Sequence, residues 1–244
     1  MRALKRDEIT FYVEKNIGEF HNKRFSSLEK LQLKKILKRK NPYLFRAKNI
    51  LTSQDLVKTF LDAHLSSQEE TLFGDFLEGL AIFICSNIYG GWKSTAEGID
   101  LEFDVAGTRN ILSIKSGPNW GNSRQVAKMR EDFNRAKRIL RTSSSAIKTF
   151  QAVNGCCYGI DNKPDKGDYF KYCGQQFWYF ISGNDKLFVE IIEPLGHKAK
   201  IWNGEFLKSY SRILNLFTQE FSSEFCDDGV INWEKLVRFN SARK

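Results

Sequence analysis

The stretch Gly98–Gly117, GIDLEFDVAGTRNILSIKSG, decides the fold, because it reads as two strands joined by a short turn. Side chains along a strand point alternately to its two faces. In the first strand the apolar residues therefore share one face, and the acidic residues, among them Asp100 and Glu102, share the other. In the returning strand, ILSIKS, Ser113 and Lys115 point away from the apolar residues in the same way. The pattern predicts a hairpin with one packed face and one polar face.

The polar face of this hairpin carries groups suited to phosphodiester chemistry. A turn centred on Gly107-Thr108 would place Asp100 opposite Lys115 and Glu102 opposite Ser113. Mg²⁺ prefers carboxylate oxygens as ligands, polarises a phosphoryl oxygen and makes its bound water more acidic. A lysine beside the metal can orient or deprotonate the attacking water, or stabilise charge in the transition state. The hairpin therefore predicts a Mg²⁺ site that hydrolyses phosphodiester bonds.

The bulk composition agrees with a nucleic-acid partner. The 244-residue chain carries a net charge of +9, and an excess of cations favours a polyanion because each neutralised phosphate releases counterions. Apolar residues make up 41% and charged residues 27%, which is typical of soluble globular proteins. No apolar run approaches the roughly 18–20 residues that span a bilayer. The first residues, MRALKRDEITFYVEKN, lack the apolar segment of a signal peptide. We therefore expect a cytoplasmic protein.

The cysteines do not form a metal-binding or disulfide framework. They are odd in number and scattered, without a CxxC pair or a histidine at zinc-ligand spacing. We expect them to be reduced and buried. They are Cys85, Cys156, Cys157, Cys173 and Cys226.

Helical patterns surround the hairpin on both sides. Apolar spacing and capping residues predict helices over about 28–37, 53–65, 67–88 and 124–141, and again from about 203. After the hairpin, AVNGCCYGI reads as a strand, DNKPDKGDYFKYCG as a loop, FWYFIS as a further element and KLFVEII as a strand.

The chain shows no internal repeat and no clear linker, so we expect one domain over residues 1–244. Within it, residues 1–66 form a helical N-terminal part, 67–200 a core, and 201–244 a helical C-terminal part. The predicted fold class is α/β in the broad sense (α+β), with a central mixed β-sheet flanked by helices.

The segment from about residue 70 to 141 resembles type II restriction endonucleases of the PD-(D/E)xK nuclease superfamily. Asp100 matches the first acid of the motif and Lys115 its lysine, and the lysine is followed by a polar loop, GPNWGNSRQ. Ile99 stands where a proline often precedes the first acid, and Ser113 stands in place of the second acid. The resemblance implies a restriction-endonuclease-like core and Mg²⁺-dependent, sequence-specific hydrolysis of double-stranded DNA. It also implies a homodimer and a cognate DNA methyltransferase that protects the host.

The second metal-binding carboxylate must come from another position, and three glutamates are candidates. Some Ser-x-Lys relatives recruit a glutamate from the following helix, which here implies Glu131. Glu102 is the second candidate, because the expected pairing puts it beside Ser113. Glu78 in the preceding helix is the third. We rank Glu102 and Glu131 together, ahead of Glu78.

The polar loop after Lys115 and the helix that follows predict the DNA contacts. Arginine pairs naturally with guanine, and asparagine and glutamine pair with adenine. Lysines beside the loop suit phosphates, which position the protein without reading sequence. Trp120 can stack on a base step or anchor the loop on the core. The candidate DNA-binding residues are Lys93, Asn119, Trp120, Asn122, Ser123, Arg124, Gln125 and Lys128.

Two other functions compete with a restriction endonuclease. A repair or recombination nuclease on the same core would prefer ends, junctions or mismatches to a fixed sequence. A non-catalytic DNA-binding protein would keep the scaffold without the chemistry. Ser113 gives this last alternative some weight, whereas the presence of both Asp100 and Lys115 argues against it.

Overall fold

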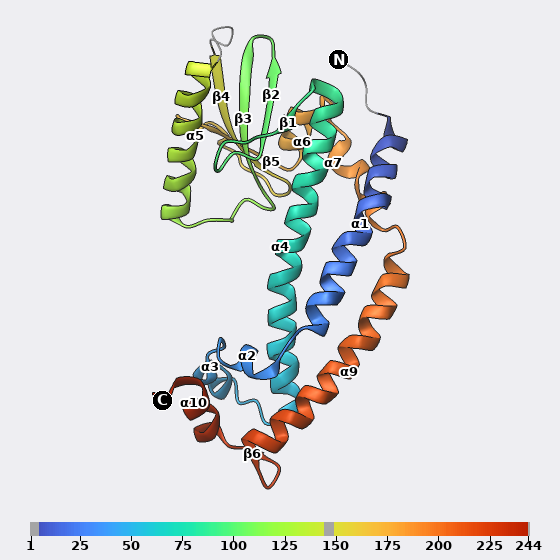
Figure 1. Ribbon diagram of the computed structural model, residues 1–244, viewed down its shortest axis with the longest axis vertical. Helices are drawn as coiled ribbons and strands as arrows, with labels where there is room; N and C mark the ends of the chain where they lie inside the picture. The colour runs from blue at the N-terminus through green and yellow to red at the C-terminus, as the bar shows by residue number, and fades with distance from the viewer. Residues whose placement is uncertain (1–4, 144–148, 244) are drawn as a thin grey trace. The chain divides into compact units, whose positions relative to one another are not determined.

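The computed structural model describes residues 5–143 and 149–243, and Figure 1 shows its elements. In chain order they are α1 (Arg6–Glu29), α2 (Leu33–Leu37), α3 (Pro42–Ala47), α4 (Ser53–Tyr89), β1 (Trp92–Lys93), β2 (Leu101–Val105), β3 (Thr108–Lys115), α5 (Ser123–Ser143), β4 (Thr149–Cys156), β5 (Phe170–Cys173), α6 (Gln175–Ser182), α7 (Leu187–Glu190), α8 (Ile192–Leu195), α9 (Ala199–Phe225), β6 (Cys226–Asp227), β7 (Val230–Ile231) and α10 (Trp233–Ser241). The chain divides into two units, which we call the sheet unit (residues 1–18 and 73–197) and the helical unit (19–72 and 198–244). The division of residues 1–244 into three parts of a single domain stays a prediction.

The sheet unit is built around a mixed five-stranded sheet with the strand order β1-β2-β3-β4-β5. The β1–β2 and β2–β3 pairs are antiparallel, and the β3–β4 and β4–β5 pairs are parallel. Helix α5 provides the crossover between β3 and β4, as parallel neighbours require. The predicted fold class, a central mixed sheet flanked by helices, is confirmed (Figure 1).

The hairpin predicted from Gly98 to Gly117 is present, but its register differs from the expectation by two residues. Ala106 and Gly107 form a two-residue turn in which both φ angles are positive, 49° and 79°. Val105 therefore pairs with Thr108, and the backbone N–H of Asp100 bonds to the carbonyl of Leu112. The expected pairing of Asp100 with Lys115 and of Glu102 with Ser113 is wrong. A shift of two residues keeps every side chain on its face, so Asp100, Glu102, Ser113 and Lys115 still share one face. That face is not a free polar surface, because Glu102 and Ser113 are buried.

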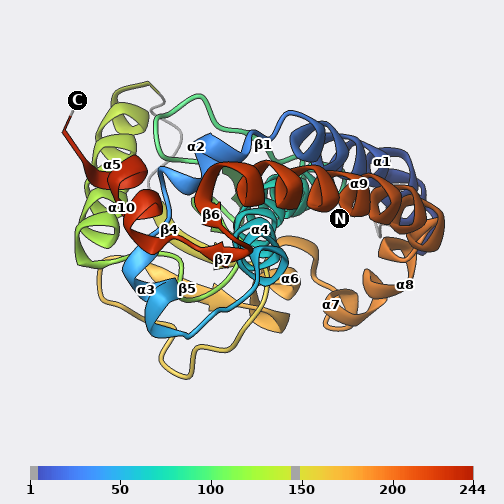
Figure 2. The ribbon, with the colours of Figure 1, turned by 90° about the horizontal axis from the view of Figure 1, so that it is seen from below.

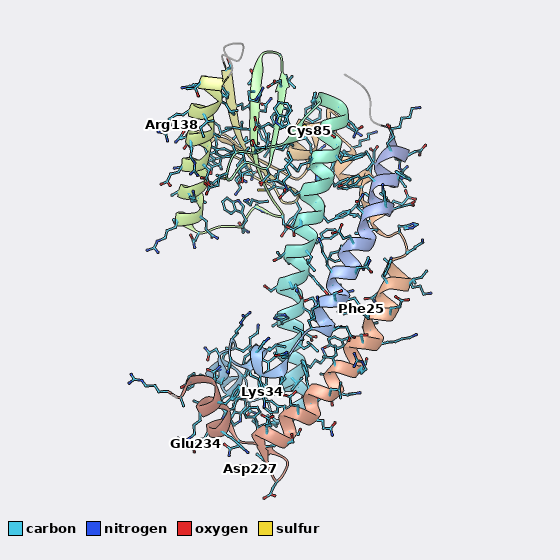
Figure 3. All side chains as sticks on the ribbon, viewed as in Figure 1. Phe25, Lys34, Cys85, Arg138, Asp227 and Glu234 are labelled. Carbon is cyan, nitrogen blue, oxygen red and sulfur yellow. The ribbon has the colours of Figure 1, made fainter. Side chains whose placement is uncertain are left out.

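Each face of the sheet packs against helices. On one side Met129 and Phe133 of α5 cluster with Ile111 and Ala152 of the central strands. On the other side the Phe103 ring lies 5.3 Å from the ring of Tyr89 and contacts α6. In Figure 3, Cys85 of α4 is one of the buried side chains, whereas Arg138 on α5 is exposed. Burial on both faces explains the apolar runs in β3 and β4.

Several predicted elements differ in the structure. The two helices expected over 53–65 and 67–88 form one helix, α4, because Ser66 and Ser67 do not interrupt it. FWYFIS lies in α6, and KLFVEII is helical in α7 and α8 rather than a strand. The expected loop DNKPDKGDYFKYCG contains strand β5 at its end. The strand has only four residues and gives little apolar signal, so its pairing with β4 in the folded protein determines its conformation.

The helical unit has its own core of aliphatic and aromatic side chains. Phe60, Leu61, Phe217 and Phe221 belong to this core, with both halves of the unit contributing. Helix α10 packs on α3 and α9, and β6 and β7 form a two-stranded hairpin before it (Figure 2). Asn41 caps α3 ahead of Pro42, so the Asn-Pro pair that ends the preceding pattern also starts a helix.

By length and hydropathy alone, α4 qualifies as a membrane-spanning helix. Core helices pass the same test, and Leu77, Leu80 and Ile84 of this helix are buried within the sheet unit. Leu56 and Leu61 are buried within the helical unit. We therefore describe α4 as a core helix that supplies apolar side chains to both units.

Candidate functional site

The hairpin brings Asp100 and Lys115 together, as the sequence predicted. The Nζ atom of Lys115 lies 3.9 Å from Oδ2 of Asp100, and both side chains are partly exposed. The same Oδ2 accepts a hydrogen bond of 2.6 Å from the backbone N–H of Ile114. Because this bond fixes the carboxylate against the strand that carries Lys115, the acid and the lysine are held next to each other by the sheet itself.

Glu78 of α4 is the third member of this cluster. Burial raises the pKa of Glu78, and the negative charge of Asp100 raises it further, while Lys93 and Lys115 oppose both effects. Its Oε1 atom lies 3.4 Å from Nζ of Lys93. Asp100, Lys93 and Lys115 thus all act electrostatically on Glu78. Glu78 ranked behind two other glutamates on sequence, and in the structure Asp100 acts on its pKa.

Glu78 and Lys93 also line an open cleft of about 660 Å³ in the sheet unit. Asp75 and Tyr12 are among its other lining residues. The cleft leaves Glu78 and Lys93 open to solvent on this side.

Glu102 occupies a different environment. It is almost completely buried, its carboxylate accepts a hydrogen bond of 2.6 Å from Ser94 Oγ, and it forms an ion pair of 3.1 Å with Arg109. Arg109 in turn pairs with Asp104. These partners occupy the Glu102 carboxylate in a network on the strands, so its role in this structure is to neutralise a partly buried arginine.

The two remaining candidates for the catalytic site are Glu131 on α5 and Ser113 on β3. Glu131 is exposed on α5, and its buried neighbour Asp132 forms ion pairs with Lys128 and Arg135. Ser113 is buried in β3, where its carbonyl accepts a hydrogen bond from Asn154. The ion pair of Lys115 with Asp100 and the effect of Asp100 on the pKa of Glu78 therefore link these three residues.

The donor set at this cluster fits Mg²⁺. Among the residues that the structure describes, no group of three or more His, Cys, Asp or Glu side chains is arranged to hold a metal ion. Mg²⁺, however, is commonly bound by one or two carboxylates with water in its remaining positions. Asp100 and Glu78 offer two such carboxylates, and a cation would offset the repulsion that raises the pKa of Glu78.

Two of the predicted DNA-binding residues cap helix α5. Oδ1 of Asn122 accepts hydrogen bonds of 3.1 Å from the backbone N–H groups of Arg124 and Gln125. In return, Oε1 of Gln125 accepts a bond of 2.9 Å from the backbone N–H of Asn122. This reciprocal arrangement is a capping box, so it fixes the start of the helix behind the loop.

Some of the other predicted DNA-binding residues are exposed, and others already bind a partner within the protein. Asn119, Ser123 and Arg124 are exposed at the loop and the first turn of α5. The indole N–H of Trp120 donates a hydrogen bond of 3.0 Å to Oδ1 of Asn154, and its ring packs on the core under α5. Lys128 forms an ion pair of 2.8 Å with the buried Asp132.

Two residues that hold the loop after Lys115 were not among those predicted from the sequence. Asn154, in the middle of β4, joins Trp120 to the carbonyl of Ser113. Lys171 in β5 donates a hydrogen bond of 2.8 Å to the carbonyl of Pro118. The signal for Asn154 was a single asparagine within the apolar run AVNGCC, since a buried amide needs partners.

Comparison with known proteins assigns the chain to a family. A family model described as type II restriction endonuclease EcoO109I matches residues 7–203 of the 244 residues. No curated protein matches the chain. The matched span contains the whole hairpin, the Asp100–Lys115 pair and Glu78, so the family assignment and the geometry concern the same residues. The protein belongs to the EcoO109I family of type II restriction endonucleases.

Proposed function

We propose that the protein hydrolyses phosphodiester bonds of double-stranded DNA at a short specific sequence and requires Mg²⁺. Asp100 and Glu78 would hold the metal, and Lys115 would act beside it. The observation that carries this proposal is the cluster itself: Lys115 Nζ lies 3.9 Å from Asp100, and Glu78 is close enough to Asp100 to have its pKa raised by that carboxylate.

The roles follow from the chemistry of the side chains. Bound Mg²⁺ would polarise a phosphoryl oxygen and make a coordinated water more acidic. The Lys115 ammonium, next to Asp100, is placed to stabilise negative charge that develops on the phosphate or to orient the attacking water. Glu78 takes the place of the acid that Ser113 cannot supply, which makes this chain a Ser-x-Lys variant with its second carboxylate on α4.

The exposed loop residues are the best candidates for reading the DNA sequence. Arg124 and Asn119 are exposed in the loop that follows Lys115 and at the start of α5, and their side chains match guanine and adenine edges. Ser123 and Lys93 suit phosphate contacts. Asn122, Gln125 and Lys128 would act mainly by fixing α5, because capping bonds and an ion pair already engage them.

Double-strand cleavage needs two active sites, so we propose a homodimer whose two-fold symmetry matches a palindromic site. A cognate DNA methyltransferase would protect the host sequence. We place the protein in the cytoplasm, where such a methyltransferase and the DNA substrate would meet it.

The test is the fragment pattern from a fully sequenced phage DNA, with Mg²⁺ and with EDTA. We expect discrete fragments with Mg²⁺, ends that map to one short sequence, and no cleavage with EDTA. A smear, or preferential cutting of branched or nicked DNA over linear duplex, would point to a repair or recombination nuclease. Sequence-specific binding without cleavage in any divalent metal would point to a non-catalytic DNA-binding protein.

A further inference from the structure

The ammonium of Lys115 is close to two groups rather than one. Its Nζ lies 3.9 Å from Oδ2 of Asp100 and over the Trp120 ring, 5.4 Å from the ring centroid. An ammonium within about 6 Å of an indole face is attracted by the negative face of the ring. The Trp120 ring therefore limits where the Lys115 side chain can go when a phosphate arrives.

The orientation of the Trp120 ring depends on Asn154. The indole Nε1–H donates a hydrogen bond of 3.0 Å to Oδ1 of Asn154. The Asn154 amide donates one of 3.1 Å from its own Nδ2 to the carbonyl of Ser113. Ser113 and Asn154 are paired in the parallel β3–β4 register, so the amide is anchored two residues before Lys115. One side chain thus ties the loop that carries Trp120 to the strand that carries Lys115.

Asn154 cannot act on DNA directly, because only 1% of its surface is exposed. Both ends of its amide are engaged within the fold. The loop is held at a second point by Lys171, whose Nζ donates to the Pro118 carbonyl. A buried amide that satisfies two groups on different segments fixes their relative position, and it leaves both without a partner if it is removed.

We propose that Asn154 is a positioning residue for Lys115, acting through the indole ring of Trp120. The proposal rests on the proposed role of Lys115 in DNA hydrolysis. The Trp120 ring then orients Lys115 and does not stack on a DNA base, and its indole N–H holds the ring in place by donating to Asn154. Removing either member of the pair should lower the rate of the chemical step without weakening substrate binding, because neither side chain contacts DNA.

The experiment compares Asn154→Ala, Trp120→Leu and Trp120→Phe, with kcat and KM measured on a duplex that holds one cleavage site. We expect Asn154→Ala and Trp120→Leu each to lower kcat on the order of 10²-fold with KM unchanged. The double variant should lose little more than either single variant, since both act through one interaction. Trp120→Phe keeps a ring beside the lysine and should retain more activity than Trp120→Leu.

A matched control is Phe150→Leu on the same strand. The Phe150 ring carries the guanidinium of Arg141 at 5.8 Å, so this variant removes a similar cation–ring contact away from the cluster. We expect normal kcat and KM for it. An equal loss of kcat would show that any weakened ring contact in β4 impairs the enzyme, which would overturn the proposal.

Other outcomes separate this proposal from the proposed function. An increased KM with unchanged kcat in Trp120→Leu would identify Trp120 as a DNA contact and overturn the positioning role. Full activity of Trp120→Leu alongside an inactive Lys115→Ala would also overturn it while leaving the catalytic site intact. Cleavage by Lys115→Ala itself would refute the proposed site. If Asn154→Ala does not fold, as thermal melting would reveal, the comparison of Trp120→Leu with Trp120→Phe decides the question.

Discussion

Replacing Glu78 by glutamine tests whether Glu78 is a metal ligand or only a partly buried carboxylate that pairs with Lys93. Glu78→Gln removes one negative charge and keeps the shape and hydrogen-bonding capacity of the side chain. If Glu78 binds Mg²⁺ together with Asp100, the variant should need a much higher Mg²⁺ concentration for cleavage. If Glu78 only pairs with Lys93, at 3.4 Å, the Mg²⁺ requirement should not change.

The size of the effect follows from electrostatics. Two unit charges about 4 Å apart interact by about 4 kcal/mol at an effective dielectric constant of about 20, so the double charge of Mg²⁺ gives about 8 kcal/mol. The amide oxygen and water would recover most of this, which leaves a loss of about 2–3 kcal/mol. Since each 1.4 kcal/mol is a factor of about ten, we expect apparent Mg²⁺ affinity to fall about 30- to 150-fold.

The same substitution should not destabilise the metal-free protein. The pKa of Glu78 is raised by burial and by Asp100, so the folded protein binds its proton more tightly than the unfolded chain does. Above the pKa of Glu78 in the folded protein, the charged carboxylate therefore lowers the free energy of unfolding. This loss of stability disappears as the pH falls through that pKa and the carboxylate is protonated. At neutral pH, Glu78→Gln should melt at the same temperature as the wild type or somewhat higher.

The assay is cleavage of a plasmid across a series of Mg²⁺ concentrations, with thermal melting in EDTA. Glu131→Gln is the matched control, because Glu131 is the exposed glutamate on α5 that the family resemblance suggested as the second acid. We expect wild-type Mg²⁺ dependence from this control. Normal Mg²⁺ dependence of Glu78→Gln together with a shifted dependence of Glu131→Gln would refute our assignment.

Three further predictions concern groups around the site. Asn122→Ala removes the cap of α5 and should cost about 1 kcal/mol, or roughly 2–4 °C in melting temperature, with the cleavage sequence unchanged in mapped fragments. Glu102→Gln breaks the buried ion pair with Arg109 and should cost about 1–3 kcal/mol in urea unfolding, with normal Mg²⁺ dependence of cleavage. Cys226, which is partly exposed, should react with iodoacetamide at pH 8 before Cys85, because burial raises the pKa of the Cys85 thiol to about 12; equal labelling rates counted by mass spectrometry would contradict this.

For the hairpin, the sequence pattern predicted which residues share a face but not the register of the two strands. Alternation placed Asp100 and Lys115 on one face correctly, because side-chain direction along a strand has a period of two. The register was missed because it depends on which two residues form the turn. Ala106 adopts a φ of 49°, which residues other than glycine, asparagine and aspartate seldom do, so the sequence favoured a turn one residue later.

The ranking of the three candidate second acids stays a prediction, because it depends on contacts between elements that are distant in the sequence. Glu102 was a candidate because the expected pairing put it beside Ser113, but in the structure its carboxylate forms an ion pair with Arg109 and accepts a hydrogen bond from Ser94. Glu78 lies 22 positions before Asp100 in the chain, as their numbers show, and only the packing of α4 beside the hairpin brings the two carboxylates close enough to interact. Contacts between side chains on distant elements have no periodic signal in one sequence.

The most direct test of the central claim compares Asp100→Ala with the wild type on one duplex that contains the mapped cleavage site. Binding is measured by gel shift and cleavage by fragment analysis in Mg²⁺. We predict that Asp100→Ala binds the duplex about as well as the wild type and does not cut it, because Asp100 holds the metal at the site beside Lys115. Cleavage at the same sequence by Asp100→Ala would contradict the account, because the chemistry would then reside outside the hairpin from Gly98 to Gly117.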